Sequence, residues 1–317
     1  MILITGGMGF IGLNTAQALL DRGQEVVLGR HRSRHIPDFL AAAIGRTAHE
    51  VALDVADPDS IRAALSTYPV DGIVHLAFSA WANAAPRAEW HAYVDGLRHL
   101  LDAAAEAGVR RVVFASSVDV YRGWETGPLK EEAPLYPRWD SPIGLFKHAG
   151  ELLGGYYAQR IGVEFVSLRL AVIYGPLYHS LQNVVGQVCH AIARGERRWR
   201  PRQSGAMPAW QRPANDFCYV KDCADGIARA ALAPHLAYPV YNIGSGTAST
   251  VLDVLHAGQA LGLDPDPEWV ATLATTGPYA DRSLALGRAR EDLGYAPRFS
   301  LSSGMADYVE WLRHHPE

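Results

Sequence analysis

A glycine-rich loop near the start of the chain constrains the fold more than any other feature. The apolar segment Ile2–Thr5 runs directly into Gly6-Gly7-Met8-Gly9-Phe10-Ile11-Gly12, and an amphipathic segment, 14–22, follows. Glycines at 6, 9 and 12 allow a tight turn, and they let the backbone approach a diphosphate at the positive end of the next helix. The pattern predicts a dinucleotide-binding strand–turn–helix. The alternative is a glycine-rich turn without a ligand.

Short apolar or β-branched segments alternate with amphipathic stretches through the first half of the chain. The predicted strands cover residues 2–5, 25–28, 50–53, 72–76, 111–115 and 164–168, and the predicted helices include 14–22 and 92–107. Alternation of this kind is typical of a parallel sheet covered on both faces. We therefore expect an α/β protein with a Rossmann-type doubly wound parallel sheet.

The second half has a different character. After Gly175-Pro176 the strict alternation is lost, and proline, tryptophan and arginine become frequent. We expect a dinucleotide-binding domain over residues 1–174 and a mainly substrate-binding, smaller lobe over 175–317. Segments 216–220 and 240–243 are predicted strands that could return to the main sheet, so that the chain rejoins the first domain around 216–245.

Composition and charge argue against several classes of protein. The 317 residues carry a net charge of -4, which gives no general attraction to nucleic acid or membranes. No apolar run reaches the roughly 18 residues that a membrane span needs, and no basic leader precedes the first strand. The odd cysteine count (Cys189, Cys218, Cys223) argues against a disulfide framework. We expect reduced thiols in a cytoplasmic protein.

The end of the second predicted strand bears on the choice of cofactor. An acidic residue about 20 residues after the glycine loop would bind the ribose hydroxyls of NAD, but the sequence there is Leu28-Gly29-Arg30-His31-Arg32. Arg30 and Arg32 could instead form bidentate hydrogen bonds with a 2′-phosphate. NADP is therefore the first choice. The alternative is that both arginines are solvated and NAD binds.

Several motifs together resemble the extended short-chain dehydrogenase/reductase family, the NAD-dependent epimerase/dehydratase group. The resemblance runs nearly end to end. It rests on the glycines at 6, 9 and 12, Asp54-Val55, His75-Leu76-Ala77, residues 114–121 around Ser117, Lys147 with 149–151, 169–176, 216–222, 242–244 and 293–297. It implies cofactor contacts from Gly6, Gly9, Phe10, Ile11, Gly12, Arg30, Arg32, Asp54, Val55, Leu76, Ala77, Phe78, Ala115, Ser116, Lys147, Val172 and Ile173.

The resemblance also implies a catalytic set of serine, tyrosine and lysine. Ser117 would polarise the reacting oxygen, and Lys147 would hold the nicotinamide ribose and lower the pKa of the tyrosine. The tyrosine is expected four residues before the lysine, on the same helical face, but that residue is Ile143. Loss of a positioned proton donor costs about 10²–10⁴ in rate. The isoleucine therefore puts in doubt the proton transfer that the family's tyrosine performs.

Two other residues are candidates for the missing group. Tyr93 lies where such enzymes usually carry an asparagine three residues before a glycine, here Gly96, and it could reach toward Lys147. The alternative is that Tyr93 packs in a helix interface. Asp119 matches an acidic base of the sugar-nucleotide dehydratases, although Val118 stands where they carry a second aspartate. Otherwise Asp119 caps or hydrogen-bonds its loop.

The substrate side is less regular than the family pattern. Arginines are concentrated beside Glu196 and could bind a substrate diphosphate, unless they form a solvated loop: Arg194, Arg197, Arg198, Arg200, Arg202 and Arg212. The usual arginine before Asp216 is replaced by Asn215. Tryptophans in predicted loops could stack on a ring, although each could equally pack: Trp81, Trp124, Trp139, Trp199 and Trp210.

These observations favour an NAD(P)-dependent oxidoreductase or epimerase acting at a carbinol or ketone carbon of a carbohydrate-like substrate, possibly an anionic nucleotide sugar. Two alternatives stay open: a degenerate member that uses the dinucleotide as a structural or sensing ligand, and a non-redox lyase or isomerase that uses Asp119. The histidines show no i,i+4 metal-binding pair with a nearby acid, so no catalytic metal is expected. The resemblance implies a homodimer formed through the helices near 93–107 and 143–160, both of which carry apolar stripes.

Overall fold

The computed structural model describes residues 1–78, 86–124, 127–136, 141–196, 198–200, 214–273 and 281–315. A seven-stranded sheet forms the centre of the molecule, with strand order β10-β6-β5-β4-β1-β2-β3 and parallel pairing throughout. The strands are β1 (Ile2–Thr5), β2 (Val26–Arg30), β3 (Ala48–Ala52), β4 (Gly72–His75), β5 (Arg111–Ser117), β6 (Glu164–Leu170) and β10 (Val240–Ile243).

This all-parallel sheet confirms the predicted Rossmann-type fold. Its strands are mostly buried because helices cover both faces, and the edge strand β3 is the most exposed of them. Strand β1 has the predicted bounds, whereas β5 and β6 each extend beyond the prediction because Ser116 and Ser117 pair with Arg169 and Leu170. Helix α1 (Phe10–Leu20) begins earlier than predicted, since the glycine loop leads directly into its first turn.

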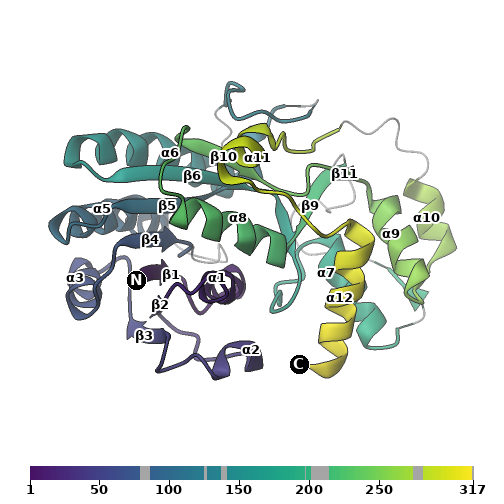
Figure 1. Ribbon diagram of the computed structural model, residues 1–317. Coiled ribbons are helices and arrows are strands. Elements are labelled where there is room, and N and C mark those ends of the chain that lie inside the picture. The colour runs from purple at the N-terminus through teal and green to yellow at the C-terminus, as the bar shows by residue number, and fades with distance from the viewer. Residues whose placement is uncertain are drawn as a thin grey trace.

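Helices form a layer on each side of the sheet (Figure 1). Helices α1 and α8 (Val220–Leu232) pack side by side on one face. The other face carries α3 (Pro58–Thr67), α5 (Gly96–Glu106) and α6 (Pro142–Ile161). The predicted helix over 92–107 is α5 preceded by a π-helical turn, η1 (His91–Asp95). Within the described ranges, no helix is long and apolar enough to span a membrane.

A smaller sheet lies beside the main one, in the order β11-β9-β7. Its strands are β7 (Val172–Tyr174), β9 (Asn215–Tyr219) and β11 (Ala248–Ser249). Residues of α7 (Val184–Ala193), α9 (Val251–Ala260) and α12 (Leu301–His314) form a hydrophobic cluster with β7 and β9. Figure 1 shows these helices grouped at one end of the molecule.

The two late predicted strands therefore go to different sheets. Strand β10 pairs with β6 at the edge of the main sheet. The expectation that 216–220 could also return there is wrong, because β9 pairs with β7 and β11 instead. Strand β10 occupies the edge beside β6, and after Ala171, whose N–H donates to the carbonyl of Ile243, the chain leaves the main sheet as β7, the strand with which β9 pairs.

Candidate active site

The candidate site lies at the carboxyl ends of β1 and β4, where the strand order reverses. From β1 the chain continues to β2 and β3 on one side, whereas β4 leads to β5 and β6 on the other. Parallel sheets bind ligands in the crevice at such a switch point. The predicted cofactor residues Leu76, Ala77 and Phe78 directly follow β4, and Ala115 and Ser116 lie near the end of β5.

The glycine loop is folded so tightly that side chains are excluded from it. Gly6 has a φ of +66°, and a Cβ there would lie 2.9 Å from the backbone nitrogen of Ala77. A Cβ on Gly12 would lie 2.4 Å from the carbonyl oxygen of Gly6. The loop thus closes against both the segment after β4 and the first turn of α1.

The first turn of α1 fits a dinucleotide diphosphate. Its N-cap is Gly9, which forms no side-chain capping bond, and the turn holds no acidic residue. Phe10, Ile11 and Gly12 form this turn, whose backbone N–H groups have no intrahelical acceptor. A diphosphate can accept hydrogen bonds from such groups at the positive end of the helix dipole. A bound nicotinamide dinucleotide would supply hydride transfer.

The end of β2 carries both predicted arginines. The Arg30 guanidinium lies 3.4 Å from the Glu50 carboxylate on β3, so part of its charge is compensated. Arg32 is exposed, and it makes no ion pair with the residues that the structure describes. Asp54 lies nearby: its carboxylate accepts from the N–H of Ala56 at 3.0 Å and lies 3.5 Å from the His31 ring.

Ser117 ends β5 and begins the 3₁₀ turn η2 (Val118–Tyr121). Its hydroxyl oxygen accepts a hydrogen bond from the N–H of Asp119 at 3.1 Å. This bond orients the hydroxyl and does not use its proton. Ser117 can therefore donate to an oxygen in the crevice.

Lys147 lies on α6 and is 7 % exposed. Its Nζ lies 4.2 Å from the centre of the Phe78 ring and 4.9 Å from that of Phe114. Burial lowers the pKa of Lys147 to about 7. Its charge in turn adds to burial in lowering the pKa of His75 to about 3, and the His75 Nδ1 is hydrogen-bonded to the Thr5 hydroxyl at 2.7 Å.

Known proteins resemble this chain over nearly its whole length. The sequence profile of the NAD dependent epimerase/dehydratase family matches residues 2–244. The chain belongs to this family. It is 30% identical to a UDP-glucose 4-epimerase of Mycolicibacterium smegmatis, over 98% of both chains. A UDP-glucose 4-epimerase of Streptomyces lividans is 28% identical over 99% of this chain and 97% of its own.

Solved structures of similar proteins have the same fold. The UDP-glucose 4-epimerase of Thermotoga maritima, solved with UDP-glucose, has a TM-score of 0.79 and 25% identity, and it covers 100% of this chain and 99% of its own. MoeE5, solved with UDP-glucuronic acid and NAD, has a TM-score of 0.76 and 27% identity over 99% of both chains. The predicted family and an epimerase-type, NAD-dependent enzyme are thus confirmed.

Among the family's expected catalytic positions, the tyrosine position departs most clearly. Ile143 is half-buried in the first turn of α6, four residues before Lys147. The turn forms without help from residue 143: the Ser141 side chain caps it by accepting from the N–H of Gly144 at 3.1 Å, and Pro142 occupies the first helical position. Either isoleucine or tyrosine would suit this backbone.

Tyr93 lies in η1, within an aromatic cluster. Its ring centre is 4.5 Å from that of Phe78 and 4.9 Å from that of Phe146. Tyr93 therefore lies near Lys147 through their shared neighbour Phe78. Ring contacts on two sides are what the packing interpretation expects, and the catalytic role of Tyr93 stays a hypothesis.

The Asp119 side chain contacts neighbouring residues of its own loop and of α6. Its carboxylate accepts from the Ser141 hydroxyl at 3.2 Å and lies 3.5 Å from the Arg122 guanidinium. These contacts connect η2 to the start of α6. They match the loop-stabilising alternative that the sequence left open.

The described arginines of the substrate side are paired with acids. Arg194 binds Glu196 at 2.8 Å, and Arg200 binds Asp266 at 2.7 Å. In the sequence, Glu196 is the acid that lies beside these arginines. The fold also brings Asp266 and Glu268 beside Arg200, which the sequence did not indicate. Arg197, Arg202 and Arg212 lie outside the described residues, as do Trp81, Trp139 and Trp210; of Arg198 only the backbone is described.

The described tryptophans of the predicted loops pack against protein. Trp199 is buried and its ring meets that of Trp269 edge-on, with 5.5 Å between ring centres. The Trp124 indole donates to the carbonyl of Pro134 at 2.6 Å.

Val172 and Ile173, also predicted to touch the cofactor, lie on β7.

A buried polar network behind the site was missed by the sequence analysis. Arg169 on β6 pairs with Glu151 on α6 at 2.7 Å and donates to the Tyr121 hydroxyl at 2.9 Å. Glu151 also accepts from the Ser116 hydroxyl, and Tyr121 donates to Asn242 at 2.9 Å. The network joins β5, β6, β10 and α6, and it fixes the helix that carries Lys147. These residues lie in motifs that carry the family resemblance, but the motifs do not predict that their side chains bind one another.

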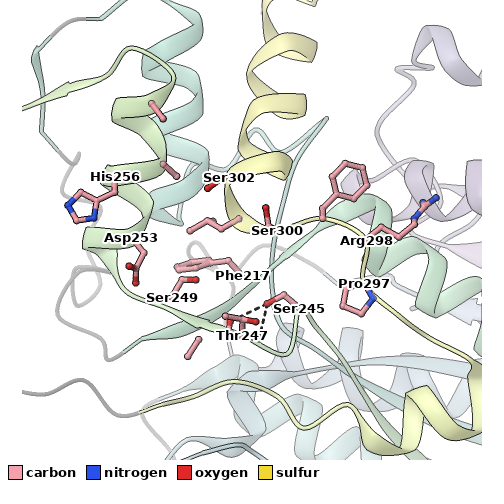
Figure 2. A pocket seen from close by; sticks show the side chains of 15 residues that line it. Phe217, Ser245, Thr247, Ser249, Asp253, His256, Pro297, Arg298, Ser300 and Ser302 are labelled. Carbon is pink, nitrogen blue, oxygen red and sulfur yellow. Dashed lines mark hydrogen bonds between the residues drawn. The ribbon is translucent and has the colours of Figure 1, made fainter.

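A separate hollow of about 770 Å³ lies between α9 and the start of α12 (Figure 2). Its lining is rich in hydroxyl groups, including Ser245, Ser249 and Ser300, and Phe217 lies against it. None of the predicted site residues lines it. It is therefore distinct from the crevice at the glycine loop.

Proposed function

We propose that this enzyme epimerises a nucleotide sugar at a carbinol carbon, through a transient ketone and a bound nicotinamide dinucleotide. The observation that carries the proposal is that the glycine loop, Phe78 with Lys147 against it, and Ser117 all follow the carboxyl ends of the adjacent strands β1, β4 and β5, in a chain that aligns end to end with UDP-glucose 4-epimerases. The substrate would carry a diphosphate and hence a negative charge.

The chain's own residues have separable roles in this proposal. The loop from Gly6 to Gly12 binds the diphosphate of the cofactor, and Asp54 with Val55 lies on its adenosine side. Ser117 donates a hydrogen bond to the reacting substrate oxygen. Lys147 is buried with its Nζ against the rings of Phe78, which follows β4, and Phe114 on β5.

We further propose that the cofactor is NADP rather than NAD. Support comes from the missing acid at the end of β2 and from the exposed guanidinium of Arg32. Arg30 contributes less, since Glu50 already compensates part of its charge. Comparing the affinities of NADP and NAD for the purified protein tests this choice.

A homodimer is also part of the proposal. Helix α6 exposes Leu152, Leu153 and Tyr156, each at least half accessible to solvent. A contiguous apolar helix face of this kind is typical of a protein interface. We expect Leu152→Arg to yield monomers in light scattering, whereas Phe39→Asp, at an exposed apolar residue of α2 (Asp38–Ala41), leaves the mass unchanged.

The decisive experiment is a turnover assay with nucleotide sugars. Protein freed of nucleotide and then supplied with NADP or NAD should interconvert a UDP-hexose with its epimer, detected by chromatography. The same hexose without the nucleotide should not react. If cofactor binds tightly but no nucleotide sugar in a broad panel reacts, the dinucleotide is a structural or sensing ligand, and the proposed activity is wrong.

A further inference from the structure

We propose that Lys147 is itself the proton-transferring group of this enzyme, taking the role that the resemblance assigns to a tyrosine at position 143. This inference rests on the proposed function and deepens it. Ile143 lies one helical turn before Lys147 on the same face of α6, so no acidic hydroxyl is supplied from that position.

The surroundings of Lys147 favour an uncharged amine. The side chain is almost completely buried, and the ring faces of Phe78 and Phe114 beside its Nζ offset only part of the hydration that a buried ammonium loses. Among the residues that the structure describes, no carboxylate pairs with it. Burial without a paired anion disfavours the ammonium form, and the pKa of Lys147 falls to about 7 for this reason.

The acidic groups on the elements around Lys147 pair with other residues. On α6 and β6, Glu151 pairs with Arg169; on η2, Asp119 pairs with Arg122; and on α5, Asp102 pairs with Arg98. Glu106 on α5 pairs with Arg62, Asp95 on η1 with His91, and Glu164 on β6 with Arg111 on β5. The other ionisable groups on these elements include His75 on β4, Tyr93 on η1, His99 on α5, Tyr121 on η2, and His148, Tyr156, Tyr157 and Arg160 on α6.

The proposed step balances as follows. The substrate O–H bond breaks, and its proton forms an N–H bond with the lone pair of the neutral amine, which becomes an ammonium. The hydrogen of the carbinol C–H bond leaves with its two electrons and reduces the oxidised nicotinamide dinucleotide, so the carbinol becomes a ketone. The reverse step returns the same proton from Nζ to the oxygen.

The titration of Lys147 can be measured without any assay of activity. The chain contains three lysines, Lys130, Lys147 and Lys221, so protein labelled with ¹³C at the lysine ε-carbon gives three resonances. Lys147→Met removes one of them and assigns it. We expect this resonance to titrate near pH 7. Titration of Lys147 above pH 9 overturns the proposal.

Amine rescue then separates proton transfer from charge. Lys147→Ala should lose turnover while nicotinamide dinucleotide binding persists in calorimetry. Added methylamine should restore turnover in proportion to its unprotonated form, so rescue rises with pH. Guanidinium, which stays charged, should not rescue. Rescue by guanidinium, or rescue that follows the protonated amine, shows that only the charge of Lys147 matters and overturns the proposal.

The two proposals fail differently. Suppose that wild-type protein turns over a nucleotide sugar, but Lys147 titrates above pH 9 or guanidinium rescues Lys147→Ala. The epimerase function then stands, and the proton-transfer role of Lys147 is wrong. If no nicotinamide dinucleotide binds, both proposals are overturned whatever the titration shows.

Discussion

The glycine loop after β1 and the first turn of α6 both carry residues of the candidate site but are specified in different ways. In the loop, backbone atoms approach one another so closely that a Cβ at Gly12 would lie 2.4 Å from the Gly6 carbonyl. At α6, Ser141 caps the helix and Pro142 starts it, so the side chain at 143 is not needed for the fold. Cofactor binding is therefore tied to the fold, whereas the catalytic side chains can change without disturbing it.

The largest effect should follow a side chain added to the loop. In Gly12→Val, the new atoms would collide with the backbone of Gly6 and Gly7. An overpacked site of this kind costs about 3 kcal/mol, so we expect the affinity for nicotinamide dinucleotide in calorimetry to fall roughly a hundredfold or more.

The matched control is Gly287→Ala at the start of α11 (Gly287–Leu293), where a Cβ meets nothing within 4 Å. It should leave cofactor binding unchanged. Normal affinity in Gly12→Val would break the proposed link between fold and cofactor.

Arg32→Ala sharpens the comparison at the other end of the cofactor. If its guanidinium binds a 2′-phosphate, the variant should lose roughly tenfold or more in affinity for NADP, because hydrogen bonds to charged groups contribute about 1.5–3 kcal/mol. Affinity for NAD should stay the same. The control is Arg46→Ala, at an exposed arginine before the amino end of β3, whereas Arg32 follows the carboxyl end of the neighbouring parallel strand β2. Equal losses for both cofactors would contradict the 2′-phosphate assignment.

Lys147→Met tests whether the buried charge of Lys147 on α6 lowers the stability of the fold. The pKa of Lys147 is about 7 in the folded chain against an ordinary 10.5, so between these values the unfolded chain binds more protons. Stability of the wild type therefore rises with pH across this window, and its charge is most costly below pH 7. We expect the variant to melt at a higher temperature than the wild type at pH 6, with a smaller gain at pH 10. A gain independent of pH would argue against a buried ammonium.

Tyr93→Phe should have the smallest effect. Phenylalanine keeps the ring contacts with Phe78 and Phe146, so turnover should change by less than about twofold if Tyr93 only packs. Tyr156→Phe, at an exposed tyrosine, provides the baseline for removing a phenol. A fall of about 10²–10⁴ would identify Tyr93 as the missing acid and contradict the role proposed for Lys147.

The fold could be predicted from the sequence because its signals are local. Strands such as Ile2–Thr5 are continuous apolar runs, and the glycine loop fixes where the first one ends. The fate of 216–220 could not be predicted, since a short apolar strand fits either sheet and the choice depends on the break at Ala171.

The site could be predicted only in part. Motif spacing brought Ser117, Lys147 and the glycine loop to one crevice, but it gave no account of what surrounds them. The Phe114 ring against Lys147 and the ion pairs of Arg30 and Arg200 depend on contacts between distant segments. Such contacts determine how far the charges of these side chains are compensated and in which direction their pKa values shift. The spacing of residues along the sequence does not reveal them.

The central claim is that the glycine loop binds a nicotinamide dinucleotide, and calorimetric titration of the nucleotide-free protein tests it most directly. With NADP, NAD and their reduced forms, we predict saturable binding at one site per chain for at least one of the four, and its loss in Gly12→Val. No heat and no thermal protection with any of the four would contradict the account.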